Sequence, residues 1–136
     1  MDYLIETSIV KALFGNDERV TVRLARVQEP DRFYTSVITQ GELLFGAHRA
    51  LGARWTQLTG QIGEFLKTVS AVLPVTGAVA SVYAGIRGNL TQRGQMIPMN
   101  DLWIAATAIC SDLTLVAHDE HFRRIDGLRL EDWLES

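Results

Sequence analysis

Four acidic residues lie at the edges of apolar runs, and any fold of this chain has to accommodate them there. Glu6 follows DYLI and Asp119 follows LTLVAH, whereas Glu42 precedes LLFG and Asp101 precedes LWIAATAI. A carboxylate at the edge of a core is tolerated only beside a cation, at a helix end or with a raised pKa. If the four converge, they form a site for a hard divalent cation such as Mg2+, and such sites suit phosphate chemistry.

Length and composition fit one compact domain without a membrane segment. Of the 136 residues, 47% are hydrophobic and 21% are charged, which predicts a single domain over residues 1–136. No apolar run approaches the roughly 20 residues of a membrane span. The acidic start MDYLIETS lacks the basic region of a secretory signal. Cys110 is the only cysteine, and we interpret it as a buried core residue. These features predict a cytoplasmic protein.

The charge pattern leaves nucleic-acid chemistry open. A net charge of −3 argues against a protein that coats nucleic acid nonspecifically, but a nuclease has an acidic active site. Basic residues stand near three of the four acids in the sequence, and either solvated helix ends or a phosphate-binding rim explains them. They are His48, Arg49, Arg54, Arg87, Arg93, Arg123 and Arg124. Among them we take Arg49, Arg87 and Arg123 as candidate substrate contacts.

Short strands alternate with helices along the chain. We expect strands over residues 3–5, 33–36, 72–75 and 115–117, and an edge strand over 128–130. We expect helices over residues 8–14, 17–28, 39–51, 62–69, 76–86 and 101–110. This alternation predicts an α/β fold with a parallel sheet of four or five strands, covered on both faces.

The predicted fold also places the four acids. Ligands of open parallel sheets bind beyond the carboxyl ends of the strands. Glu6 and Asp119 follow strands directly, and we expect Glu42 and Asp101 in the first turns of helices that start on the same side. Four carboxylates can therefore reach one crevice.

Each acid alone also has a purely structural explanation. Asp101 can be a helix N-cap, and Glu6 can favour the positive end of the first helix dipole. Asp119 can be a turn residue, and Glu42 can form a capping box with Thr39. Only the order of the four along the chain favours a joint site.

Two histidines, His118 and His121, flank Asp119. Their spacing is compatible with a transition-metal site, but no further histidine or cysteine pattern supports one. We therefore interpret them as surface histidines near the site, with His118 a candidate to face phosphate.

Four segments together resemble the PIN-domain family, and specifically the VapC-type toxins of bacterial toxin–antitoxin pairs. In chain order they are YLIETSIVKALF, SVITQGELLFGAHRA, MNDLWIAATAI and LTLVAHDEHFRRIDGLRLEDW. The resemblance implies a three-layer α/β/α sandwich and a ribonuclease that needs Mg2+ or Mn2+. It further implies a structured RNA substrate such as a tRNA or rRNA loop, a homodimer, and a cognate antitoxin that blocks the site.

The resemblance also implies roles for the acids. Glu6 and Asp101 would be the principal metal ligands, and Asp119 would complete the shell directly or through water. Glu42 would hold a metal-bound water or act in proton transfer. For the antitoxin contact, the resemblance implies an apolar helix of the partner in the groove near Leu43, Leu44, Phe45 and Trp55, with a basic side chain of the partner entering the acidic pocket.

Glu6 departs from the family pattern, which has aspartate at this position. Glutamate adds a methylene, about 1.5 Å of reach, whereas Mg2+ demands near-ideal octahedral geometry. Glu6 can bind the metal directly, bind it through water, or occupy the metal position and leave a weak enzyme. Thr7 or Ser8 would orient this carboxylate or a phosphate. Two functions therefore remain: an endoribonuclease that uses a metal-activated water, or an impaired PIN module that binds its antitoxin in a repressor complex.

Overall fold

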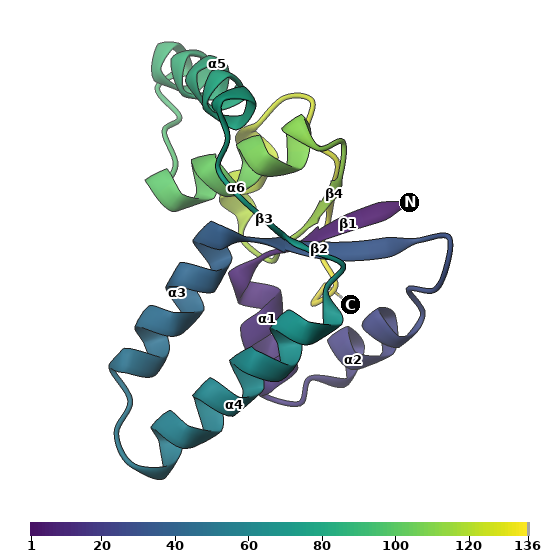
Figure 1. Ribbon diagram of the computed structural model, residues 1–136. Coiled ribbons are helices and arrows are strands. Elements are labelled where there is room, and N and C mark those ends of the chain that lie inside the picture. The colour runs from purple at the N-terminus through teal and green to yellow at the C-terminus, as the bar shows by residue number, and fades with distance from the viewer. Residues whose placement is uncertain (136) are drawn as a thin grey trace.

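Five parallel strands form the centre of the molecule, and helices cover both faces of the sheet (Figure 1). The computed structural model describes residues 1–135. Its elements are β1 (Asp2–Ile5), α1 (Thr7–Phe14), α2 (Glu18–Ala25), β2 (Arg32–Ser36), α3 (Val37–His48), α4 (Ala53–Thr68), β3 (Val72–Leu73), α5 (Gly77–Arg93), α6 (Met99–Cys110), β4 (Thr114–Val116), the 3-10 helix η1 (Glu120–Arg124) and β5 (Leu130–Glu131). The strands lie in the order β3-β2-β1-β4-β5.

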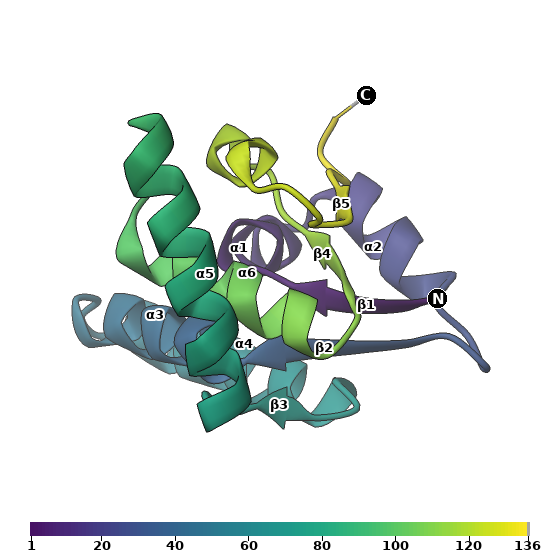
Figure 2. The same cartoon turned by 90° about the horizontal axis from the view of Figure 1, so that it is seen from above.

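Successive residues of the central strand β1 face opposite sides of the sheet, as the pleat requires. Leu4 packs in a core with residues of α5 and α6, whereas Ile5 packs in a second core with residues of α1 to α4. Both side chains are fully buried. Figure 1 shows the same division, with α5 and α6 apart from the other four helices, and Figure 2 shows the strands from top to bottom in the order β5, β4, β1, β2 and β3. The expected three-layer α/β/α sandwich is thus confirmed.

The direction of chain progression across the sheet reverses at β1. From β1 the chain adds β2 and β3 on one side, and it then returns to add β4 and β5 on the other. β1 and β4 are parallel neighbours, and the backbone N–H of Glu6 extends their pairing to the carbonyl of Val116 at 3.0 Å. A reversal of this kind opens a crevice at the carboxyl ends of the two strands.

The boundaries of several elements differ from those expected. β3 and β5 have only two residues each, and β4 begins one residue early at Thr114. α5 runs on to Arg93 and ends at Gly94, whose φ of 64° gives the left-handed cap that glycine favours. Cys110 is half-buried rather than buried. Within residues 1–135, each helix is too short or too polar to cross a membrane.

Candidate active site

Glu6 comes directly after β1 and is the N-cap residue of α1. Its Oε1 accepts hydrogen bonds from the backbone N–H of Ser8 at 2.9 Å and from the Ser8 hydroxyl at 2.5 Å. The carboxylate therefore does stabilise the start of the first helix. Glu6 is also only 6% exposed. Its place at the carboxyl end of β1 is compatible with a second role, in the crevice beside the other acids.

The pKa of Glu6 is raised to about 7, chiefly by burial and in addition by the negative charges of Asp101 and Glu42. The two hydrogen bonds from Ser8 act in the opposite direction, because they stabilise the ionised form. The dominant effect is loss of hydration, which favours the protonated carboxyl. A nearby cation would favour its ionised form.

Glu42 lies in the second turn of α3, because that helix begins earlier than expected. Ser36 is the N-cap, and its hydroxyl accepts a hydrogen bond from the backbone N–H of Thr39 at 3.1 Å. The predicted capping box of Thr39 with Glu42, and the placement of Glu42 in a first turn, are therefore wrong. Instead, Glu42 Oε1 accepts a 2.7 Å hydrogen bond from the hydroxyl of Thr7.

Asp101 is in the first turn of α6, as expected, but it does not cap the helix. Pro98 occupies the N-cap position, and α6 begins at Met99. The Asp101 side chain is largely buried, with 13% exposure. Burial raises its pKa, the charges of Asp119 and Glu42 raise it further, and a hydrogen bond from His121 lowers it.

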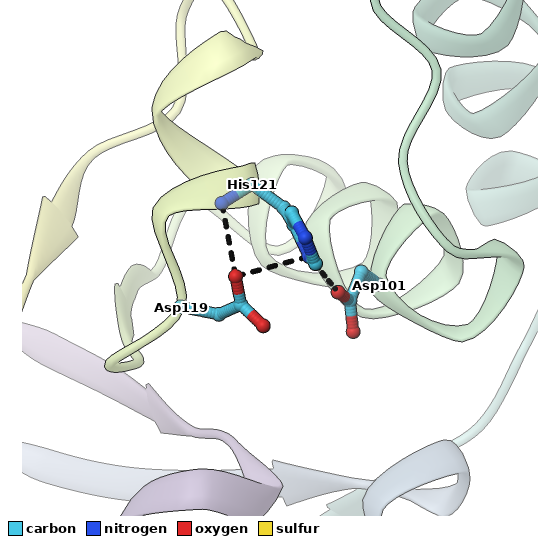
Figure 3. Close-up of side chains that lie close together, drawn as sticks. All are labelled: Asp101, Asp119 and His121. Carbon is cyan, nitrogen blue, oxygen red and sulfur yellow. Dashed lines mark hydrogen bonds and ion pairs between the residues drawn. The ribbon is translucent and has the colours of Figure 1, made fainter.

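Asp119 follows β4 and caps the short helix η1, where its Oδ1 accepts from the backbone N–H of His121 at 3.1 Å. The ring of His121 turns back toward the acids (Figure 3). Its Nδ1 lies 3.2 Å from Asp101 Oδ2 and 3.0 Å from Asp119 Oδ1. The interpretation of His121 as a surface histidine beside the site is thus wrong, because it lies between two of the acids.

The four predicted acids form one electrostatic cluster but not one set of ligands. Glu6 experiences the charges of Asp101 and Glu42, and Asp101 experiences those of Asp119 and Glu42. Asp101, Asp119 and His121 each offer a ligand atom within 4.8 Å of the other two. Among residues 1–135, Glu6 belongs to no such group of three.

The predicted basic contacts have other partners. The guanidinium of Arg49 lies 5.1 Å from the centre of the Phe45 ring. Arg87 donates to the hydroxyl of Tyr83 at 2.8 Å, and Arg123 is paired with Glu135 at 3.2 Å. None of these contacts involves one of the four acids, and the role of the three arginines in substrate binding stays a prediction.

A hollow of about 440 Å3 adjoins the acids. It is lined by Ser8, His118, Asp119, Glu120, His121 and Arg124. His118 is held there by its backbone N–H, which donates to the Ser8 hydroxyl at 3.1 Å, and by its Nδ1, which lies 2.9 Å from Asp132 Oδ2. Arg124 was named among the basic residues near the acids, but not among the candidate substrate contacts.

A second surface lies on α3 and α4, where Leu44, Phe45 and Trp55 are 41%, 63% and 47% exposed. We call these three residues and Leu51, which is 86% exposed, the α3–α4 apolar surface. A groove of about 320 Å3 runs between α1, α3 and α4. Its lining includes Leu43, Ala47, Leu58 and Ile62, and also the cations Lys11, Arg49 and Arg54.

Comparison with known proteins agrees with this architecture. Residues 3–128 match the family model of the PIN domain. Ribonuclease VapC5 of Mycobacterium tuberculosis is 36% identical over 100 residues, which cover 72% of each chain. Ribonuclease VapC1 of Haemophilus influenzae is 30% identical over 135 residues, or 98% of each chain. The chain therefore belongs to the PIN-domain family, with VapC proteins as its relatives.

Solved structures of VapBC complexes have the same fold. VapBC2 of Rickettsia felis, solved with a DNA fragment from its promoter, matches with a TM-score of 0.90 at 27% identity, over 98% of this chain and 99% of that one. VapBC-1 of nontypeable Haemophilus influenzae matches with a TM-score of 0.87 at 27% identity, over 99% of this chain and all of that one. The resemblance inferred from the sequence is thereby confirmed.

Proposed function

We propose that this chain is a Mg2+- or Mn2+-dependent endoribonuclease and the toxin of a toxin–antitoxin pair. The observation that carries the proposal is the convergence of Glu6, Glu42, Asp101 and Asp119, from four different elements, at the carboxyl ends of β1 and β4. Relatives named ribonuclease VapC support RNA as the substrate.

The residues present fit a divalent ion. Two carboxylates and an imidazole offer ligand atoms within 4.8 Å of one another. The raised pKa of Glu6 and of Asp101 reflects crowded, poorly hydrated negative charge, which a cation relieves. We assign Asp101 and Asp119 as direct ligands, and Glu6, which stands outside this group of three, would contribute its carboxylate directly or through water. When bound, the ion lowers the pKa of a coordinated water and neutralises charge on the phosphate.

The protein's own groups then position the reactants. Glu42 is held by Thr7 at 2.7 Å and remains partly exposed, so it can accept a proton from an attacking water. Arg124, in the hollow beside Asp119, offers a positive charge for a phosphate of the RNA backbone. The Ser8 hydroxyl is already engaged, since it donates to Glu6 and accepts from the backbone N–H of His118, and we favour direct hydrolysis by water over a covalent intermediate.

Substrate and partners follow from the relatives. We propose a structured RNA, such as a tRNA or rRNA loop, a homodimer, and action in the cytoplasm. A further matched structure, VapBC-5 of Mycobacterium tuberculosis, belongs to the VapBC family of toxin–antitoxin systems, and with the two VapBC structures above it supports a cognate antitoxin for this chain. The α3–α4 apolar surface and the adjoining groove offer that partner an apolar docking site.

The decisive experiment is cleavage of total RNA by the purified protein. We expect cleavage with Mg2+ or Mn2+, its loss in EDTA, and its loss in Asp101→Asn. Asp126→Asn is the matched control, because this aspartate is 84% exposed and pairs with Arg93 away from the four acids. Activity that survives both EDTA and Asp101→Asn would reject the proposal.

A second function has an observation in its favour. Glutamate stands at position 6, where the VapC pattern has aspartate, and its buried carboxyl has a pKa of about 7. A poorly ionised first ligand would make a weak enzyme, whose main role would be to bind its antitoxin in a repressor complex. Comparison with Glu6→Asp separates the two functions.

A further inference from the structure

We propose that His121 is a nitrogen ligand of the metal site and makes that site prefer Mn2+ to Mg2+. The inference rests on the proposed function, because it assumes that a divalent ion binds beside Asp101 and Asp119. It adds a ligand that the four-acid pattern does not contain, and it specifies the ion.

The first argument is the spacing of the donor atoms. Nδ1 of His121 lies 3.2 Å from an oxygen of Asp101 and 3.0 Å from an oxygen of Asp119. Adjacent ligands of an octahedral ion with bonds of about 2.1 Å are about 3.0 Å apart. The His121 nitrogen therefore already has the separation of a neighbouring ligand from each of the two oxygens.

The second argument concerns the hydrogen-bonding capacity of the ring. A neutral imidazole has one N–H, and Nδ1 can direct it well at one acceptor only. Here two carboxylate oxygens lie near the same nitrogen (Figure 3). A cation bound by all three groups interacts with both carboxylate oxygens and with the nitrogen lone pair at once. A single proton on Nδ1 can serve only one of the two oxygens well.

The local fold fixes the ring in this place. Asp119 caps η1 by accepting from the backbone N–H of His121, so the two ligands are joined by a short, hydrogen-bonded turn. The next residue, Phe122, is 1% exposed and anchors η1 in the core beneath α6. The His121 side chain is itself only 34% exposed. The ligand is therefore pre-organised rather than recruited from a mobile surface.

The nature of the donors then selects the ion. Mg2+ binds oxygen and keeps several waters, whereas imidazole suits transition metals. Carboxylates suit Mn2+ as well as Mg2+, so an oxygen-rich site with one imidazole favours Mn2+ among the two. We expect removal of the ring to weaken Mn2+ binding more than Mg2+ binding.

The test measures metal binding and does not depend on RNA cleavage. Mn2+ is titrated into metal-free protein, and pulsed electron paramagnetic resonance of the Mn2+ form reports any directly bound 14N. We expect a 14N coupling in the wild type that changes when the histidines carry 15N. We expect His121→Ala to abolish it and to weaken Mn2+ binding about 10-fold, with Mg2+ binding changed less than about 3-fold.

The chain offers matched controls, since it has three histidines. His48→Ala, in α3, and His118→Ala, beside the site, should keep the 14N coupling. Isotope labelling of the wild type needs no variant, so the result stands even if His121→Ala folds poorly. Mn2+ binding without a nitrogen coupling would overturn the inference alone, and so would undiminished Mn2+ affinity in His121→Ala. Absence of all Mn2+ binding would overturn the metal site and the proposed function with it.

Discussion

The hydroxyl of Thr7 donates a 2.7 Å hydrogen bond to Oε1 of Glu42, and this bond joins the first turn of α1 to the second turn of α3. The same hydroxyl lies 3.2 Å from the hydroxyl of buried Thr39. Thr7 is itself 5% exposed, so water competes little for the bond. The structure thus gives Thr7 the task of holding Glu42, whereas the sequence suggested that it orients Glu6 or a phosphate.

We expect Thr7→Val to lower the rate of RNA cleavage about 10-fold while leaving Mg2+ or Mn2+ binding within about 3-fold, because Glu42 loses its positioning partner. The unfolding free energy should fall by about 1–2 kcal/mol, since a buried hydrogen bond is lost. Kinetics, metal titration and urea unfolding measure the three quantities. Thr7→Ser should retain most of the activity, and Thr91→Val, at an exposed position of α5, is the control for the change itself. Equal losses in Thr7→Ser and Thr7→Val would contradict this role.

Glu6→Asp should raise the cleavage rate about 10-fold or more. Aspartate is an excellent N-cap, so the hydrogen bond from the Ser8 backbone N–H can persist. Aspartate is also the residue that the VapC pattern has at this position, and its side chain is shorter by one methylene. Cleavage rates at saturating Mg2+ or Mn2+ and metal titration of both proteins test this. If the two proteins are equally active, the impaired-enzyme function loses its support.

Sequence reasoning located the sheet and the acids because both depend on local patterns. Apolar runs followed by polar turns mark strands; Glu6 stands directly after one of them and Asp119 three residues after the end of another. Strand alternation then fixes the side of the sheet on which they meet. The family resemblance, which depends only on four segments and their order along the chain, was confirmed over residues 3–128.

The sequence alone could not show which of two possible residues caps a helix, or which partner a side chain contacts. Ser36 and Thr39 are both good cap residues, and only the position of Ser36 at the end of β2 decides that α3 begins at Val37. That shift of two residues moves Glu42 into the second turn. His121 was missed for a different reason: the direction of a ring in a 3-10 turn depends on η1 packing through Phe122, which is a tertiary contact.

The metal-free protein should lose stability as pH rises from about 5 to 7. The pKa of Glu6 is about 7 in the folded chain against 4.5 for an ordinary glutamate, so in this range the folded state binds more protons than the unfolded state. The unfolding free energy therefore falls with pH, by up to roughly 3 kcal/mol for a shift of this size. The raised pKa of Asp101 acts with the same sign. Urea unfolding in EDTA at pH 5 and pH 7.5 measures the change.

Glu6→Gln isolates the contribution of this one carboxyl, since the amide does not ionise. Its unfolding free energy should fall much less between the two pH values, and Glu64→Gln, at an exposed position of α4, should behave as the wild type. Added Mg2+ or Mn2+ should reduce the pH dependence of the wild type, because a bound cation favours the ionised carboxylate. A pH dependence in Glu6→Gln as steep as in the wild type would mean that Glu6 is not the group responsible.

Phe45→Ala and Trp55→Ala should each weaken the complex with the antitoxin by about 1–3 kcal/mol, or roughly 5- to 150-fold in Kd. The reason is that a large exposed aromatic on a monomer surface contributes most when a partner buries it, and Phe45 is 63% exposed beside the groove. Neither change should lower RNA cleavage by the free protein or its unfolding temperature, because both side chains are exposed and neither belongs to a core cluster. Val22→Ala, a 44% exposed apolar residue on α2, is the control.

The partner would be the product of a short reading frame overlapping the start of this gene, and binding is measured by calorimetry. Unchanged affinity in both aromatic variants would move the antitoxin contact away from the α3–α4 apolar surface.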